Sequence, residues 1–104
     1  MNPYLAATLV LAAGLEGIRE GLDPGKPNED NLYEIGETER AARGNEFLPQ
    51  TLQEAVAAFA ADPLVEATLG KALRDEFIRY KTEEWEAYHL SVSKWEVERY
   101  SHMF

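Results

Sequence analysis

The chain has 104 residues, of which 45% are hydrophobic, so it can form one small domain or a piece of a larger one. Ten Lys and Arg against nineteen Asp and Glu give a formal net charge of -9, which repels phosphate backbones and anionic lipids and excludes nucleic acid and membrane as expected partners. Cysteine is absent, which excludes disulfides, thiolate metal sites and cysteine nucleophiles and agrees with an expected cytoplasmic location.

The first predicted helix covers about residues 3–20. Asn2 and Pro3 form a strong helix start, because the Asn side chain accepts from free amides and proline has its φ already fixed. The apolar run from Leu5 to Leu15 is too short to cross a bilayer, and no basic segment precedes it, so we expect neither a membrane span nor a secretory signal. Most of this helix is apolar around its circumference, so it is predicted to be buried and something must cover it.

A polar connection is predicted over about residues 21–50. Gly21 ends the first helix, and the prolines and glycine of residues 23–27 make turns. Residues 38–43 are candidates for one helical turn. A stretch of this length with little periodicity is uncommon inside a compact domain, so it is either functional or lies against a surface outside this chain.

Three further helices are predicted, over about 51–61, 63–69 and 71–103. The first begins with the capping box of Thr51 and Glu54, and the second begins with Asp62-Pro63. Neither proline nor glycine follows Lys71, so the last is one long helix, or two helices with a bend. The sequence therefore predicts an all-α fold, a single helical segment over 1–104 with about four helices and a long irregular loop.

An aromatic stripe is predicted along the last helix. Its members repeat at spacings of seven, three, four and three, which is typical of a coiled coil. A helix of this length cannot bury the stripe against a few short helices, so contact with another subunit or domain is favoured. The stripe begins at Ile78, and its candidate interface residues are Trp85, Tyr88, Val92 and Trp95.

Two patterns contain histidine, and neither predicts a metal site. Glu86 and His89 have the Glu-x-x-His spacing of di-iron bundles, but the sequence has no second such motif, so a solvated or packed histidine is favoured. Glu98 and His102 lie four residues apart, a pairing that an acidic chain end often produces by chance. No catalytic, cofactor-binding or metal-binding residue is predicted in this chain.

Other chemistries lack their motifs in the sequence. The acidic run between Asp75 and Glu86 favours a solvated helix face. Neither glycine-rich phosphate-binding pattern occurs, so nucleotide binding has no local support. Ser91, Ser93 and Ser101 lie on the predicted helix without a strand-to-helix elbow, so nucleophilic catalysis is also unsupported.

Several motifs follow one another along the chain in a specific order: Asn2-Pro3-Tyr4-Leu5-Ala6, residues 11–18, Leu22-Asp23-Pro24-Gly25-Lys26-Pro27, Asn31-Leu32-Tyr33-Glu34, Leu48-Pro49 and residues 51–55. In this order they resemble the C-terminal helical region of the glutamine synthetases. The ending, with Glu84-Trp85, Tyr88-His89, Val92-Ser93, Trp95-Glu96 and Tyr100, resembles that of one bacterial branch of the family. The resemblance covers essentially the whole chain.

The resemblance implies a ligase that joins glutamate to ammonia with ATP, through a γ-glutamyl phosphate. Its sites hold divalent metals, Mg or Mn, between neighbouring subunits of a ring, and related branches use amines such as putrescine. The family's metal-binding and substrate-binding residues belong to the preceding part of the chain, so Met1 is expected to be a truncation point. The implied role of this segment is structural: it braces the rest of the catalytic domain and contributes to a homo-oligomer.

The resemblance also singles out Tyr33. It aligns with a tyrosine that some enterobacterial-type glutamine synthetases modify with AMP. The family run is Asn-Leu-Tyr-Asp-Leu-Pro-Pro, whereas residues 31–37 here lack both prolines. Modification of Tyr33 is therefore one hypothesis, and a tyrosine that anchors the loop is the favoured alternative.

Two other functions stay open beside the ligase segment. A free-standing helical interaction module would use Trp85 and Trp95 to bind itself or a full-length ligase. A metal-binding bundle would depend on Glu86 and His89 alone.

Overall fold

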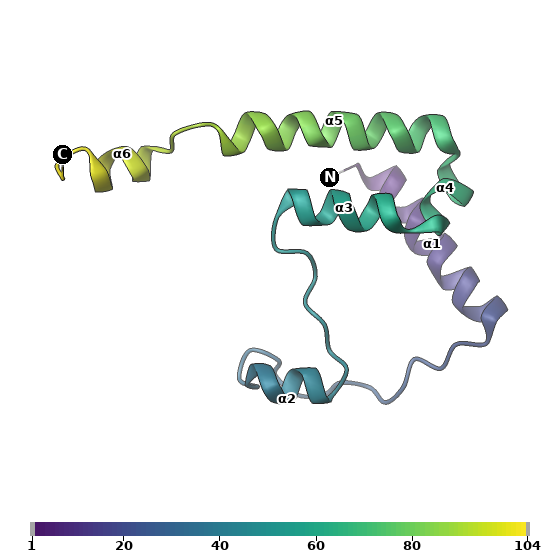
Figure 1. Cartoon of the computed structure of the whole chain (residues 1–104). Coiled ribbons are helices and arrows are strands. Elements are labelled where there is room, and N and C mark those ends of the chain that lie inside the picture. The colour runs from purple at the N-terminus through teal and green to yellow at the C-terminus, as the bar shows by residue number, and fades with distance from the viewer. Residues whose placement is uncertain (1, 104) are drawn as a thin grey trace. The chain divides into compact units, whose positions relative to one another are not determined.

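The computed structural model describes residues 2–103. Among these residues the regular secondary structure is all helical, with no strand (Figure 1). This confirms the predicted all-α class. The chain forms two compact units, Met1–Gln50 and Thr51–Phe104. The sequence prediction treated residues 1–104 as a single helical segment. The division arises because the apolar side chains of the second unit pack among themselves.

The first unit begins with helix α1, Pro3–Glu20, over the range predicted from the sequence. The Asn2 side chain accepts from the amides of Tyr4 at 3.0 Å and Leu5 at 3.3 Å. Gly21 ends the helix at a φ of 63°, and the amide of Leu22 donates to the Gly17 carbonyl at 2.9 Å, as in a Schellman motif. Both ends are therefore fixed by local side chains and backbone.

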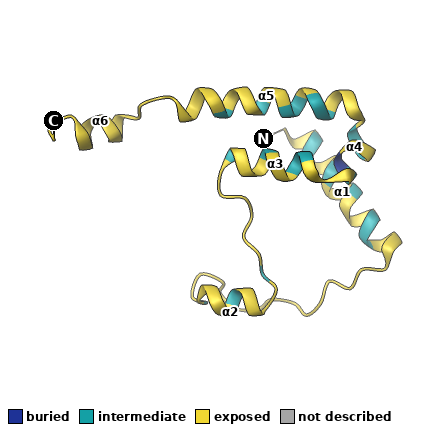
Figure 2. Cartoon of the chain, in the orientation of Figure 1, coloured by how far each residue is buried: buried dark blue, intermediate teal, exposed yellow. Residues whose placement is uncertain are grey.

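Helix α1 was predicted to be buried, but none of its residues is buried in the structure (Figure 2). Helix α2, Glu37–Ala42, is the other helix of this unit, and it makes no contact with α1 in the described residues. The described part of this unit offers no second apolar helix to cover α1, so this unit does not supply the cover that the apolar sequence predicts. Helix α2 lies where one helical turn was expected over 38–43.

The second unit begins with three helices that pack on one another: α3, Leu52–Ala61, α4, Pro63–Leu69, and α5, Lys71–His89. The Thr51–Glu54 capping box starts α3, and Asp62 accepts from the Leu64 amide at 2.9 Å to start α4. Gly70, at a φ of 79°, turns the chain from α4 into α5. All three starts lie within a residue of the positions predicted from the sequence.

The small core of this unit lies where α3, α4 and α5 meet. Val65 on α4 is 5% exposed, and the rings of Phe59 and Phe77 pack with centroids 4.9 Å apart. The Arg74 guanidinium donates to the Ala60 carbonyl at 2.6 Å and so ties α5 to the last turn of α3. These contacts fix the α3–α5 pair on which the candidate site depends.

Over 71–103, where one long helix or two helices with a bend were expected, the structure has two helices, because α5 ends at His89 and α6 covers Lys94–Tyr100. Ser93 is extended, with a ψ of 154°, and its hydroxyl accepts from the Glu96 amide at 3.2 Å. The Glu96 carboxylate accepts in return from the Ser93 amide at 2.7 Å. This capping box gives the backbone an alternative to continuing the helix, without proline or glycine.

None of the helices within residues 2–103 is both long and apolar enough to cross a bilayer.

Candidate functional site

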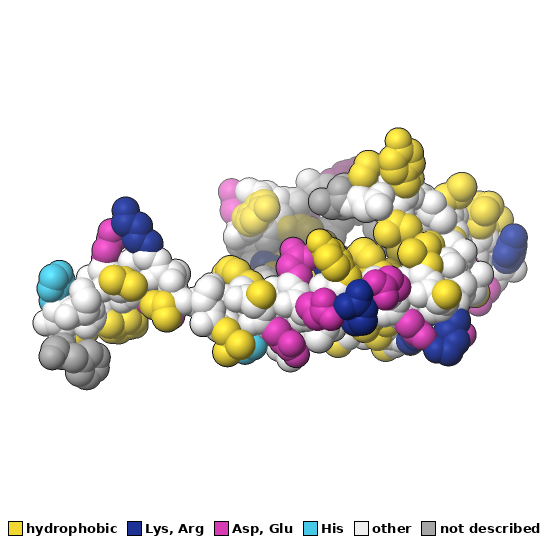
Figure 3. All heavy atoms as spheres, turned by 90° about the horizontal axis from the view of Figure 1, so that it is seen from above, with side chains coloured by type: hydrophobic (Ala, Val, Ile, Leu, Met, Phe, Trp, Pro, Cys, Tyr) yellow, Lys and Arg dark blue, Asp and Glu magenta, His cyan; other side chains and the backbone are white. Residues whose placement is uncertain are grey.

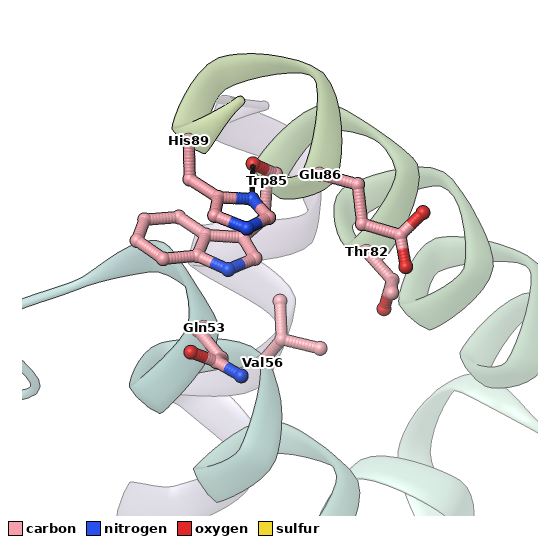
Figure 4. A pocket seen from close by; sticks show the side chains of 6 residues that line it. All are labelled: Gln53, Val56, Thr82, Trp85, Glu86 and His89. Atoms are coloured by element: carbon pink, nitrogen blue, oxygen red, sulfur yellow. Dashed lines mark hydrogen bonds between the residues drawn. The ribbon is translucent and has the colours of Figure 1, made fainter. Parts of the chain in front are cut away.

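A pocket of about 260 Å³ lies between α3 and α5 in the second unit (Figure 4). Helix α5 supplies four residues at positions i, i+3, i+4 and i+7, which places them on one helical face. Helix α3 supplies two residues, one turn apart, from the opposite side. The lining residues are Gln53 and Val56 of α3 with Thr82, Trp85, Glu86 and His89 of α5.

The indole of Trp85 is held in place by its neighbours on α5. The His89 imidazole stacks on it, with centroids 5.4 Å apart and an interplanar angle of 6° (Figure 4). The His89 Nδ1 lies 3.2 Å from the Trp85 carbonyl oxygen, so the ring is tied to its own helix end. The Tyr88 ring, with its centroid 6.0 Å from the indole, packs beside it. Trp85 is half-buried, and the imidazole of His89 covers one face of its indole.

The Glu-x-x-His pair of the metal hypothesis lines this pocket. The His89 Nδ1 already contacts a backbone carbonyl, and the ring is committed to the stack on Trp85. Within residues 2–103, no three His, Asp or Glu side chains lie close enough together to hold a metal ion. Glu98 of the second histidine pattern instead pairs with Lys94 at 3.6 Å. The metal-bundle hypothesis thus gains no further ligand from the described residues.

The predicted aromatic stripe is divided between two helices. Trp85 lies on α5 at the pocket, whereas Trp95 lies on α6 and is 63% exposed. Tyr88 and Val92 are 71% and 73% exposed. Because residues 90–93 interrupt the helix, the coiled-coil spacing does not extend across both tryptophans. The interface role of these side chains stays a prediction.

In the first unit, Arg40 holds the turn that contains Tyr33. Its guanidinium donates to the Leu32 carbonyl at 3.0 Å and the Ile35 carbonyl at 3.3 Å. The same group lies 4.2 Å from the centroid of the Phe47 ring. The Tyr33 side chain is 97% exposed, so it does not anchor this loop by burial. The anchor is Arg40, which the sequence analysis missed.

The outer face of α5 carries alternating ion pairs (Figure 3). Arg79 bridges Glu76 and Glu83, each at 2.5 Å, and these hydrogen-bonded partners raise its pKa while Arg79 lowers the pKa of Glu76. Lys71 and, less strongly, Arg74 lower the pKa of Asp75 through hydrogen bonds. Each cation faces a carboxylate, and all of these groups except the partly buried Arg74 are largely exposed, so they form a solvated face and not an acid–base site.

The pocket was not predicted as a site. Its signal is present in the sequence, since Thr82, Trp85, Glu86 and His89 share one face of a helix. The sequence analysis placed Trp85 in the aromatic stripe and did not group it with the other three residues of this face. Which residues of α3 face them depends on how α3 packs against α5. That packing is not visible in a local pattern.

Comparisons with known proteins give a consistent result. The family model described as glutamine synthetase, catalytic domain, matches residues 1–100. The chain is 45% identical over 103 residues to a glutamate–methylamine ligase of Methyloversatilis universalis, covering 99% of this chain and 23% of that protein. It is 42% identical to a glutamine synthetase of Halobacterium salinarum, with the same coverage, and 40% identical to one of Archaeoglobus fulgidus, covering 95% of this chain and 20% of that protein. The chain therefore spans about a fifth to a quarter of the length of these relatives.

Proposed function

This chain belongs to the glutamine synthetase catalytic-domain family, and on that premise we propose that it is the C-terminal helical segment of an ATP-dependent ligase joining glutamate to ammonia or an amine. Its role is structural. It braces the rest of the catalytic domain and contributes contacts with neighbouring subunits of a homo-oligomer, in the cytoplasm. The observation that carries the proposal is the family match over residues 1–100, supported by 45% identity across 99% of the chain.

The chemistry of the ligase is assigned to residues outside this chain. ATP and Mg or Mn belong to the proposal for the whole ligase. We assign no catalytic step to this segment, because the family's metal-binding and substrate-binding residues are expected in the part of the ligase that precedes it. The names of the relatives include a methylamine ligase and glutamine synthetases, and the choice between ammonia and an amine is proposed to lie with the rest of the catalytic domain.

The proposal is tested with the purified 104-residue chain. We expect no consumption of ATP that depends on both glutamate and ammonium, whereas adding the remaining catalytic portion of the ligase should restore it. Appreciable turnover by the pure chain would overturn the structural role.

The intact mass of the native polypeptide provides a second test. Antibody capture from source cells followed by mass spectrometry should give a chain several times heavier than 11.7 kDa. The same spectrum tests modification of Tyr33, which rests on the resemblance and is supported by the 97% exposure of its side chain. An added AMP on that residue supports modification, and its absence under nitrogen-rich and nitrogen-poor growth counts against it.

A free-standing interaction module is the second candidate, and the exposure of Trp95 favours it. In that case the native mass would lie near 11.7 kDa. Changing Trp85 and Trp95 to alanine should weaken self-association or ligase binding, because buried aromatics often dominate interface energies. Unchanged sedimentation and unchanged binding would remove this candidate.

A further inference from the structure

One side of helix α1 has a row of exposed side chains that we call the α1 stripe. Its members repeat at spacings of four, three, four and three, which places them on one side of the helix. The Thr8 hydroxyl donates to the Tyr4 carbonyl at 2.7 Å, so it needs no partner from outside. No other helix of residues 2–103 packs on α1. The members of the α1 stripe are Tyr4, Thr8, Leu11, Leu15 and Ile18, all of them exposed.

Gly14 borders the α1 stripe, three residues after Leu11 and four before Ile18. A glycine inside a helix destabilises that helix by about 1 kcal/mol relative to alanine. Neither backbone conformation nor crowding within the chain explains the glycine here. Its φ is not positive, and a Cβ added to it would meet no atom within 4 Å. Gly14 therefore leaves space beside the helix backbone that no described residue fills.

The family match indicates what covers the α1 stripe. The chain corresponds to 23% of the length of the methylamine ligase that it resembles, so the larger part of such a ligase lies outside it. None of the five stripe residues is charged, which suits an apolar surface of that larger part. A second copy of this chain would instead bring a further net charge of -9, which opposes self-association.

We propose that the α1 stripe is the docking face for the remaining catalytic portion of the same ligase polypeptide, and that the backbone of that portion crosses α1 at Gly14. Without a Cβ at the crossing, the two backbones can approach more closely than any other residue allows. This inference rests on the proposed function and specifies which surface of the segment performs the bracing.

The crossing is tested by a substitution with opposite effects in the segment and in the full-length ligase. In the isolated 104-residue chain, Gly14→Leu should slow hydrogen exchange of the α1 amides by about three- to fivefold, because leucine is the better helix former and the space is open. In the full-length ligase the same change should cause loss of assembly in sedimentation, because the leucine would occupy the place of the crossing backbone. Ala13→Leu is the matched control, since it adds a leucine on the opposite side of α1 and should leave assembly intact.

Thiol accessibility tests the docking face itself. The chain has no cysteine, so Ile18→Cys and Ala13→Cys each add one thiol to this segment, whose alkylation by iodoacetamide is followed by peptide mass. In the isolated chain both thiols should react at similar rates. In the full-length ligase the thiol of Ile18→Cys should react roughly tenfold more slowly than that of Ala13→Cys, since docking excludes the reagent until the segment opens.

The outcomes separate this inference from the proposed function. Equal alkylation rates in the full-length ligase would overturn the docking face. A Gly14→Leu ligase that assembles like the parent, or an Ala13→Leu ligase that fails equally, would overturn the crossing at Gly14, while the ligase assignment would stand. A native mass near 11.7 kDa would instead remove the proposed function and this inference with it.

Discussion

At the scale of single residues, Arg40 shows how a charged side chain can organise a loop that has no core. Its guanidinium reaches back eight residues to the Leu32 carbonyl and five to the Ile35 carbonyl, while its face lies over Phe47. Hydrogen bonds from a charged donor contribute more than neutral ones, about 1.5–3 kcal/mol each at most. The turn around Tyr33 is therefore held by Arg40, a residue that lies outside the turn.

Replacing Arg40 by methionine should release this turn. The amide of Glu34, which donates to the Asn31 carbonyl at 3.0 Å, should lose protection from hydrogen exchange by roughly tenfold or more, because at least one charge-assisted bond is lost. Arg43→Met is the matched control, since Arg43 pairs with Asp30 and Glu39 at the surface, where ion pairs contribute little. Equal protection in the two variants would show that Arg40 does not hold the turn.

Glu96 provides a prediction on pH. Its carboxylate accepts from the Ser93 amide, and this bond, followed by the one from the Ser93 side chain, lowers its pKa below the ordinary value of 4.5. A lowered pKa in the folded state means that the stabilisation of α6 is complete above about pH 4.5 and is lost as the pH falls through the lowered value.

The expected result is a loss of helical Cα chemical shifts over Lys94–Tyr100 on acidification below about pH 4.5. Glu96→Gln keeps a side chain that can accept a hydrogen bond but does not titrate, so its α6 shifts should change much less. If both proteins lose α6 in the same pH range, another group controls this helix.

At the scale of elements, the helices that the sequence predicted well are those with local end signals. Each of these signals forms its hydrogen bonds within a few residues of a helix end, so it can be recognised in the linear sequence. The signals are Asn2-Pro3 and Gly21 for α1, Thr51 with Glu54 for α3, and Asp62-Pro63 for α4. The break before Ser93 belongs to one of the two alternatives left open over 71–103, and the Ser93–Glu96 capping box produces it without proline or glycine. The Arg40 anchor and the α3 side of the pocket depend on contacts between separate segments, and no local pattern encodes these.

The packing of α3 on α5 depends on the Phe59–Phe77 pair. Phe59→Ala should lower the free energy of unfolding of the second unit by about 2–4 kcal/mol, since a half-buried ring and its aromatic contact are both removed. Tyr80→Ala, at a position 58% exposed on the same helix pair, should cost under about 1 kcal/mol. Urea unfolding followed by circular dichroism measures both, and equal losses would mean that the pair is not central to the packing.

At the scale of the whole molecule, neither of the two units encloses a large core in the described residues. Among the described residues, Val65 is the one buried hydrophobic side chain. A polypeptide with so little internal burial gains little stability from its own core, which agrees with the proposal that it is a segment of a larger catalytic domain.

Helix α1 contributes a clear part of the apolar surface that is left exposed. Leu11, Leu15 and Ile18 follow an i, i+4, i+7 pattern and are 65%, 43% and 78% exposed. If the rest of the ligase covers this face, the isolated chain should bind a hydrophobic dye. The double change Leu11→Glu and Ile18→Glu should reduce that binding severalfold while α1 stays helical, because glutamate is a good helix former.

The same double change in the full-length ligase should prevent assembly into active enzyme, since two charges would be buried without partners at the covered face. Tyr33→Glu is the control, because it adds charge at a side chain that is 97% exposed and lies outside this pattern. Sedimentation and glutamate-dependent ATP consumption measure the outcome. A full-length double variant that assembles and turns over like the parent would mean that this face of α1 stays in solvent, and the bracing role would have to rest on another surface of the chain.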